Sequence, residues 1–189
     1  MDDGVVVRRA VERDLSGLVD LKVAWADRPD EGEERVALAS ALREWIGRSD
    51  VVCVVADEGG RLVGMAWMVV FPRVPNLGDT ERYSADLQSV LVLAPHRRRG
   101  IGRRLIAKLC DLADDRGIRR VTVQSNLTAK SVYMSEGFLP SGLLLERISK
   151  APMSQVCSIV WVWMVQGSRA SRKRWRRWSR RVVAGRWGR

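Results

Sequence analysis

The sequence has few of the residues on which metal centres, disulfide frameworks and membrane spans depend. Its three cysteines, Cys53, Cys110 and Cys157, are widely spaced and set in apolar surroundings. They match neither zinc nor disulfide spacing and are typical of small buried side chains in a reducing compartment. No apolar run approaches the ~20 residues that cross a bilayer, and the acidic start at Met1 lacks the basic-then-apolar order of a secretion signal. We therefore expect a cytoplasmic protein without a bound metal.

Positive charge is unevenly distributed along the chain. The 189 residues carry a net charge of +11. Residues 168–189 contain nine arginines, one lysine and no acid, a net charge of +10, so the first 167 residues carry +1. The composition, 46% hydrophobic and 29% charged, is that of a soluble globular protein. We predict one domain over residues 1–167 and a basic, arginine- and tryptophan-rich tail over 168–189.

Hydrophobic periodicity predicts an α/β domain. Strand patterns lie at residues 4–9, 51–56, 61–71, 84–93, 119–124, 138–146 and 156–165, and helical patterns at 15–24 (with Asp14 as its cap), 36–46, 101–115 and 128–136. Polar or breaker-rich loops are predicted at 26–35 and 72–83, and a hairpin turn at 57–60. Antiparallel hairpins thus precede a βαβ unit, which predicts a mixed sheet.

A basic, glycine-containing turn between a strand and a helix is the most informative stretch. It runs from Leu91 to Leu105 and reads LVLAPHRRRGIGRRL. Glycines at 100 and 102 allow backbone N–H groups to approach a ligand, and the helix N-terminus adds roughly half a positive charge. This predicts a site for a phosphate group, although a helix start with a solvated basic turn explains the stretch alone equally well. A Rossmann fingerprint would need a third glycine at 105, and a P-loop would need Gly-Lys-Ser/Thr, which is absent.

Two sequence blocks carry a resemblance to a known family. The arrangement Arg97-x-x-Gly100-x-Gly102, after a strand ending in a proline, resembles the pyrophosphate-binding signature of the GNAT acetyltransferases. The block with Asn126, Ala129, Tyr133 and the closing Gly137-Phe138 resembles the second signature of that family. The resemblance runs from about residue 5 to residue 165. It implies a GNAT fold, an α/β structure whose mixed, mostly antiparallel sheet is splayed at the acetyl-CoA site and flanked by helices.

The resemblance implies a set of residues that bind acetyl-CoA as co-substrate. Backbone groups of the turn would hold the pyrophosphate, and the end of the preceding strand would pair with the pantetheine arm. Asn126 would hydrogen-bond this arm, or alternatively cap the helix that follows it. The residues are Leu91, Val92, Leu93, Arg97, Arg98, Arg99, Gly100, Ile101, Gly102, Arg103, Asn126 and Tyr133.

Two residues are candidates for the proton transfers of acetyl transfer. Tyr133 would protonate the departing thiolate, since a phenol of pKa ~10 is protonated at neutral pH; the alternative is a core aromatic. Asp86, fourteen residues before Gly100, would take the proton of the amine, directly or through a water; the alternative is an exposed charge on its strand. Gln88 shares the face of Asp86, and His96, the only histidine, lies in the basic turn and is a weaker candidate base.

The implied function is an N-acetyltransferase that acts on a primary amine of a small molecule or protein. The first alternative is an acyl-CoA-binding module that transfers nothing. The second is a nucleic-acid-binding protein, an alternative that only the basic tail supports. Members of the family are often dimers, so the resemblance admits a homodimer, and the sequence leaves the oligomeric state and the acceptor open.

The tail at 168–189 resembles nothing in the family. Trp175, Trp178 and Val182 lie at i, i+3 and i+7, the spacing of a basic amphipathic helix. Such a segment is suited to an anionic membrane surface or to nucleic acid. The alternatives are a disordered, solubilising tail and an accident of the reading frame.

Deletion of residues 168–189 should leave folding and acetyl-CoA turnover on small amines intact, because the tail follows the last predicted strand and has too few apolar residues for a core. The melting curve and turnover of the truncated chain check this. Any binding of the full chain to duplex DNA should weaken with salt, with a log–log slope near −0.9 per phosphate contact. Aggregation of the truncated chain, or loss of its cooperative melt, would show that the tail is structural.

Overall fold

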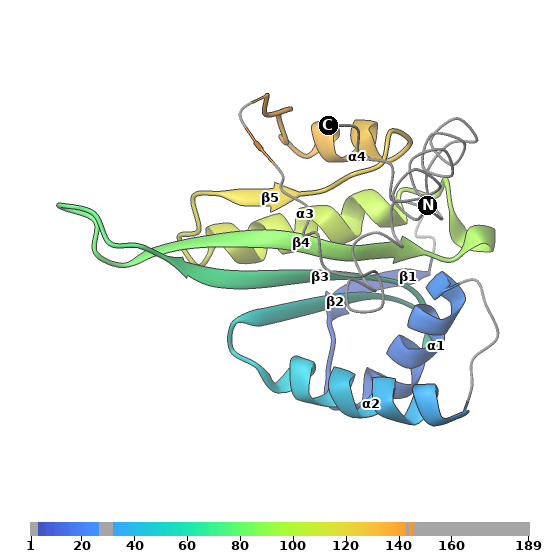
Figure 1. Ribbon diagram of the computed structural model, residues 1–189. Coiled ribbons are helices and arrows are strands. Elements are labelled where there is room, and N and C mark those ends of the chain that lie inside the picture. The colour runs from blue at the N-terminus through green and yellow to red at the C-terminus, as the bar shows by residue number, and fades with distance from the viewer. Residues whose placement is uncertain (1–3, 27–31, 143, 146–189) are drawn as a thin grey trace, which may run out of the picture. The chain divides into compact units, whose positions relative to one another are not determined.

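A five-stranded mixed sheet organises the chain. The computed structural model describes residues 4–26, 32–142, 144 and 145. The strands are β1 (Val5–Arg9), β2 (Val51–Glu58), β3 (Arg61–Arg73), β4 (Arg82–Val92) and β5 (Val121–Val123), and they lie in the order β1-β2-β3-β4-β5 (Figure 1). The first four pair antiparallel, and β5 pairs parallel with β4. The predicted mixed, mostly antiparallel sheet is confirmed.

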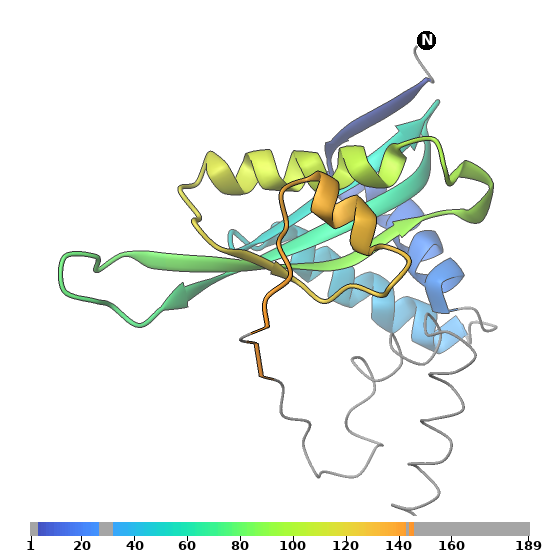
Figure 2. The same cartoon turned by 90° about the horizontal axis from the view of Figure 1, so that it is seen from above.

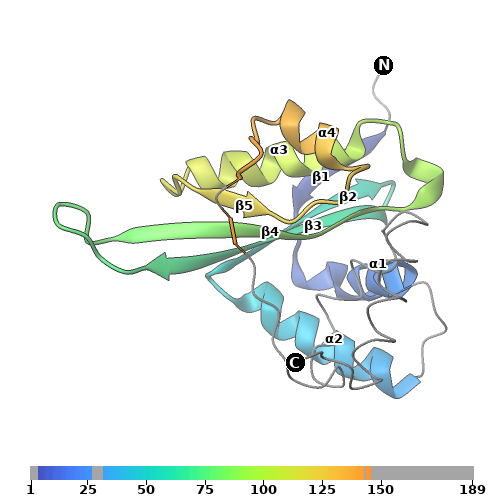
Figure 3. The same ribbon diagram turned by 45° about the horizontal axis from the view of Figure 1, so that its top comes forward.

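Helices cover both faces of this sheet. The helices are α1 (Leu15–Ala26), α2 (Gly32–Gly47), α3 (Ile101–Asp114) and the short α4 (Lys130–Ser135). Figures 1 and 3 show α1 and α2 on one face, and α3 and α4 on the other. Contacts divide the chain into two units, residues 1–124 with 131–138, and residues 125–130 with 139–189. The first unit holds all five strands and helices α1 to α3.

The run of apolar residues in β2 follows from its place between the two helical layers. Val51, Cys53 and Val55 belong to the core under α1 and α2, and the alternate residues Val52 and Val54 are equally buried. Successive side chains of a strand point to opposite faces, so Val52 and Val54 face the α3 layer. A strand that is buried on both faces must be apolar at every position, as β2 is.

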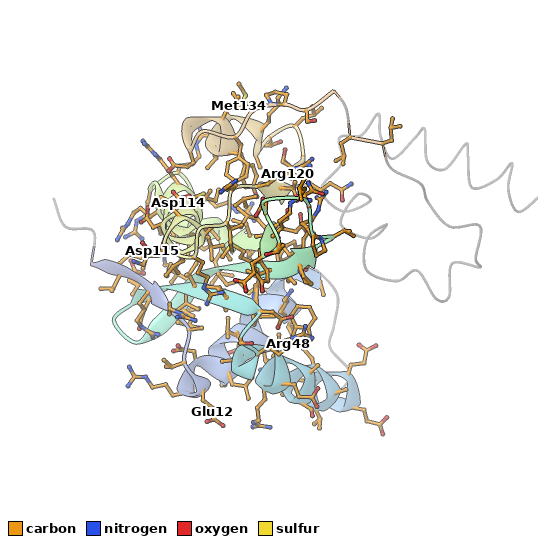
Figure 4. The ribbon with its side chains drawn as sticks, turned by 90° about the vertical axis from the view of Figure 1, so that its left-hand side faces the viewer. Glu12, Arg48, Asp114, Asp115, Arg120 and Met134 are labelled. Carbon is orange, nitrogen blue, oxygen red and sulfur yellow. The ribbon has the colours of Figure 1, made fainter. Side chains whose placement is uncertain are left out.

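The amphipathic spacing of α3 sets the packing of the second layer. Its buried residues, Ile101, Leu105, Ile106, Leu109 and Ala113, form one stripe along the helix. The acidic pair that follows the stripe, Asp114 and Asp115, lies at the exposed end of α3, toward the viewer in Figure 4. Burial of this stripe against β2, β3 and β4 fixes where the first turn of α3 lies relative to the end of β4.

A partly buried ion-pair cluster joins β1, β2 and the entry to α1. The guanidinium of Arg8 lies 2.6 and 2.8 Å from the two carboxylate oxygens of Asp14 and 2.8 Å from Asp57. The hydrogen bond from Arg8 holds the pKa of Asp14 below its usual value, and burial opposes this shift. Asp14 also accepts a hydrogen bond from the Val11 N–H, 2.8 Å, and therefore caps the short 3-10 turn at residues 12–14.

The β2–β3 and β3–β4 connections differ in how well the sequence predicts them. The turn after Glu58 is two residues long, Gly59-Gly60, with positive φ at both, as a tight hairpin requires. The predicted loop at 72–83 is wrong at both ends, because β3 continues to Arg73 and β4 begins at Arg82. Pro72 has no N–H to donate, but Val70, two residues earlier, is where the edge of β3 that faces β2 makes its last bond, to Asp50. Beyond that point the hairpin projects from the rest of the sheet, and no described strand faces this edge at Pro72 (Figure 2).

Two other predicted boundaries change. The loop prediction at 26–35 is wrong for residues 32–35, because α2 begins at Gly32 and carries Glu33 and Glu34 in its first turn. Acidic side chains there interact favourably with the helix dipole, although the same residues read as a loop in the sequence. Residues 27–31 lie outside the described residues.

The strand predicted at 138–146 is wrong for residues 138–142, 144 and 145, none of which is in a strand. Pro140 has no N–H to donate, and Leu139, Leu144 and Leu145 are exposed. The strand predicted at 156–165 and the tail at 168–189 lie outside the described residues, so both remain predictions.

Candidate active site

The pairing of β4 with β5 ends halfway along β4. Ala85, Asp86 and Leu87 pair with Val121, Thr122 and Val123, and β5 ends there. From Gln88 to Val92, β4 keeps its pairing with β3 but has no strand on its other side among the described residues. This segment, residues 88–92, is called the open edge of β4 below. It offers unpaired backbone groups to a ligand that lies alongside it.

A bulge distorts β4 at the start of the open edge. Trp67 pairs with Gln88 and Met65 with Leu91, so both Ser89 and Val90 lie opposite Ala66. Ser89 has φ of 53°, a left-handed conformation that is rare for a residue other than glycine. Bulges bend a strand and increase its twist, so this one turns the open edge away from the line of β5.

The backbone after β4 forms an N–H-rich turn. A 3-10 turn at Ala94–His96 leads to Arg98 with φ of 66° and Gly100 with φ of 74°. Gly100 is the residue that precedes α3, and its carbonyl accepts the first helical hydrogen bond, from Arg104. The N–H groups of Ile101, Gly102 and Arg103 have no carbonyl partner within the helix. The turn therefore presents backbone donors and the positive end of the helix dipole at one place.

Most arginine side chains of the turn hold the protein together. Arg97 donates to the Val92 carbonyl, 2.9 Å, and ties the turn to the end of the open edge. Arg99 donates to Glu58, 2.8 Å, and His96 Nδ1 lies 3.1 Å from the same carboxylate. Glu58 was not evident from the sequence, because it lies 41 residues before Arg99.

The remaining arginines differ in their partners. Arg103 donates to Glu136, 2.6 Å, which links α3 to the residue after α4, and Arg104 donates to the Val5 carbonyl. Arg98 is exposed and, within the described residues, forms no ion pair or hydrogen bond. An anion at the turn would therefore meet backbone N–H groups and Arg98 rather than a cluster of free guanidiniums.

Asp86 is held in place by two neighbours in the sheet. Its Oδ1 lies 3.0 Å from the hydroxyl of Thr122 on β5, and its Oδ2 accepts a hydrogen bond from Gln88, 3.1 Å. The prediction that Gln88 shares the face of Asp86 is thus confirmed. Thr122 was not evident from the sequence, since only the parallel pairing of β4 and β5 brings it to Asp86. The carboxylate lies directly before the open edge.

Tyr133 is buried on α4, with only 7% of its surface exposed. Burial raises the pKa of its phenol to about 12, and the nearby charge of Asp86 adds to this rise. Of the charged groups, Asp86 is the one that acts on the Tyr133 phenol, so the two predicted proton-transfer residues are electrostatically coupled. Met134, the next residue, is half-exposed and lies on the outer side of α4 (Figure 4).

The Gly137-Phe138 pair fixes the ring of Tyr133. Gly137 has φ of 83°, its N–H donates to Met134, and the Phe138 N–H donates to the Tyr133 carbonyl. These bonds form a Schellman motif, which commonly brings the residue after the glycine back onto the last helical turn. The Phe138 ring packs edge-on against Tyr133, with centroids 5.6 Å apart. The helix cap therefore orients the phenol.

Asn126 caps the turn that leads into α4. Its side-chain oxygen accepts a hydrogen bond from the Ala129 N–H, 2.8 Å, and its carbonyl accepts one from Lys130, 3.2 Å. The alternative prediction for this residue, an N-terminal cap, is confirmed. A contact of Asn126 with a ligand remains a prediction.

The family comparison agrees with this geometry. The model of the acetyltransferase (GNAT) family matches residues 19–138, a span that includes the open edge, the turn and α4. The chain belongs to this family. The family resemblance implies a splayed sheet, and in this chain the place that matches is the end of the β4–β5 pairing at Leu87.

Individual relatives differ in how much of the chain they match. A glucosamine 6-phosphate N-acetyltransferase of Trypanosoma brucei brucei is 26% identical over 67% of this chain and 84% of its own length. An uncharacterised protein of Mycobacterium leprae is 33% identical over 40% of this chain, and the match spans only 21% of that protein. A predicted acetyltransferase of Clostridium acetobutylicum, solved with acetyl-CoA, has the same fold, with a TM-score of 0.63 and 17% identity over 76% of this chain and 96% of that one.

The described part of the chain contains no helix long and apolar enough to cross a membrane. It also contains no group of three or more His, Cys, Asp or Glu side chains placed to hold a metal ion.

Gly64 should be essential for the bulge in this GNAT domain. A Cβ at Gly64 would lie 2.9 Å from the Leu91 carbonyl oxygen and 3.2 Å from Leu105 Cδ1. Gly64→Ala should therefore destabilise the fold by about 1–3 kcal/mol, the usual range for overpacking. Urea unfolding measures this, with Gly47→Ala as the matched control, because a Cβ at Gly47 meets nothing within 4 Å. Equal stability of the two variants would show that β4 shifts away without cost.

Proposed function

We propose that the protein transfers the acetyl group of acetyl-CoA to a primary amine of a small molecule or protein. The observation that carries this proposal is the continuity of the open edge of β4 with the N–H-rich turn at the start of α3. An extended, phosphate-ended ligand needs both features in that order. The membership of the chain in the GNAT family supports acetyl-CoA as this ligand.

The end of β4 and the turn after it would bind different parts of acetyl-CoA. Backbone groups of Leu91, Val92 and Leu93 would pair with the amides of the pantetheine arm, like an added strand. Backbone N–H groups from Arg98 to Arg103 would receive the pyrophosphate, with the side chain of Arg98 available to it. Arg97 would contribute indirectly, because its bond to Val92 keeps the end of the open edge next to the turn.

Asp86 would supply the base. A primary amine such as lysine has a pKa of ~10.4 and is mostly protonated at neutral pH, so its proton must be removed before attack. The carboxylate of Asp86 accepts from Gln88 and Thr122, and a carboxylate has about four acceptor sites in all. It therefore retains capacity for a bridging water or the amine itself, at the start of the open edge.

Tyr133 would supply the acid. The amine attacks the thioester carbonyl, the C–S bond breaks, and the thiolate of CoA takes a proton from the phenol. With its pKa raised to about 12, the phenol stays protonated over the whole physiological pH range. A phenol of pKa about 12 is a weaker acid than a thiol of pKa ~8.5, so this transfer is completed as the phenolate takes up the proton that Asp86 removed from the amine.

An acceptor screen with purified full-length chain tests the proposal. Amines are offered with acetyl-CoA, and release of the CoA thiol is followed. Amino sugars belong in the screen because one relative is a glucosamine 6-phosphate N-acetyltransferase. Acetyl-CoA binding without thiol release on any amine would favour the non-catalytic alternative, and absence of binding would contradict both.

Substitution of Gly102 should separate binding from folding. A Cβ at Gly102 would lie 3.8 Å from Val92 Cγ2, an ordinary contact, so Gly102→Ala should fold normally. A longer side chain would extend over the first turn of α3, so Gly102→Leu should bind acetyl-CoA at least ~10-fold more weakly, a loss of about 1.4 kcal/mol. Calorimetric titration measures both, and undiminished affinity of Gly102→Leu would remove the turn from the binding site.

Tyr133→Phe should keep the affinity for acetyl-CoA and lower turnover by about 10²- to 10⁴-fold, the usual contribution of general acid catalysis. The matched control is Tyr83→Phe, since Tyr83 is the only other tyrosine and is exposed on the β3–β4 hairpin. Steady-state kinetics on an acceptor found in the screen measures both variants. Full activity of Tyr133→Phe would mean that another group or water protonates the thiolate.

A further inference from the structure

A lysine side chain of α1 reaches the bulge at the start of the open edge. The Nζ of Lys22 donates to the hydroxyl of Ser89, 2.7 Å, and lies 5.3 Å from the centroid of the Trp25 ring. Ser89 is the bulged residue with the left-handed backbone, and Asp86 lies three residues before it. A primary amine of the protein itself therefore lies at the bulge that begins the open edge, alongside which the proposed donor would bind.

The charge of Lys22 is poorly compensated. The groups that hold its Nζ are a hydroxyl and an indole face, neither of which is an anion. On β2 the titratable group that acts on Lys22 is the Cys53 thiol, and burial raises the pKa of this thiol, so it is neutral. On β4, Asp86 is bonded to Thr122 and Gln88, and the acid on α1, Asp20, is paired with Arg35 of α2.

Burial without an anionic partner makes Lys22 a better nucleophile. Desolvation lowers the pKa of its ammonium to about 8. At pH 8 about half of such amines are neutral, against roughly one in 250 for a lysine of pKa ~10.4. A large fraction of Lys22 is therefore already in the uncharged form that attack on a thioester requires.

We propose that Lys22 is a self-acetylation site, at which the protein accepts the acetyl group of its own bound acetyl-CoA. This proposal rests on the proposed function. The neutral Nζ attacks the thioester carbonyl, a C–N bond forms, the C–S bond breaks, and the thiolate of CoA takes the proton lost by the amine. The products are N-acetyl-Lys22 and free CoA, and no further reactant is needed.

Acetylation would change the acceptor side of the site. It removes the positive charge and adds a neutral amide beside Ser89 and Trp25. An acetylated Lys22 would fill space at the bulge, so it should compete with an external amine. Acceptor turnover should consequently fall as the modified fraction rises.

The test is incubation of the full chain with acetyl-CoA alone, followed by intact-mass measurement and peptide mapping. The expected result is one added acetyl group, about 42 Da, on Lys22. Its rate should not depend on protein concentration, since the donor is bound to the same molecule, and should rise with pH up to about 8 and then level off. Lys108 on α3, on the opposite face of the sheet, is the internal control and should react more slowly.

Lys22→Arg keeps the positive charge and should lose the added mass, whereas Lys108→Arg should retain it. Calorimetry with acetyl-CoA on the same samples distinguishes the possible failures. If acetyl-CoA does not bind, the proposed function is wrong and this inference with it. If it binds while Lys22 stays unmodified, or reacts no faster than Lys108, only the self-acetylation is wrong. Both outcomes are measured on the unsubstituted protein, so the conclusion holds even if Lys22→Arg does not fold.

Discussion

The loss of a hydrogen-bonding partner for β4 after Leu87 is the constraint on which the rest of the site depends. Strands inside a sheet are paired along both edges, but β5 ends at Val123, and among the described residues only β3 pairs with residues 88–92. The bulge at Ser89 and the close approach of Leu91 to Gly64 stabilise this divergence. The open edge is therefore a feature of the backbone itself, set by the strand pairing and the bulge.

Two helical layers keep the open edge aligned with the turn that follows it. The apolar stripe of α3 packs on β2, β3 and β4, and this packing places the N-terminus of α3 beside the end of β4. Arg97 and Arg99 then tie the turn to Val92 and to Glu58 on the neighbouring strand β2. The proposed phosphate site is thus a backbone site supported by side chains, since four of the five arginines there are bonded to other parts of the protein, through Val92, Glu58, Glu136 and Val5.

Desolvation sets the protonation state of two titratable side chains, the buried Tyr133 and the half-buried Lys22. It raises the pKa of the Tyr133 phenol to about 12 and lowers that of the Lys22 ammonium to about 8. In both cases burial favours the neutral form. A neutral acid lies on one side of the divergence and a partly neutral amine on the other, which suits a reaction between a thioester and an amine.

The sequence by itself determined the order of the described elements, the mixed sheet and the glycine turn, because periodicity, turn glycines and helix starts are local properties. The family signature also pointed to Tyr133 and the Gly137-Phe138 pair, and the structure adds that this pair is a Schellman cap whose Phe138 ring packs on Tyr133. The sequence misplaced the ends of the β3–β4 hairpin, and it predicted a strand where residues 138–142, 144 and 145 form none. The strand propensity of these segments is weak, so hydrogen bonding to a neighbouring strand determines whether they are strands. Only the tertiary structure brought Thr122 to Asp86, Glu58 to Arg99 and Lys22 to Ser89, because each pair is separated by 36 to 67 residues and is joined by sheet register or helix packing, which no local pattern encodes.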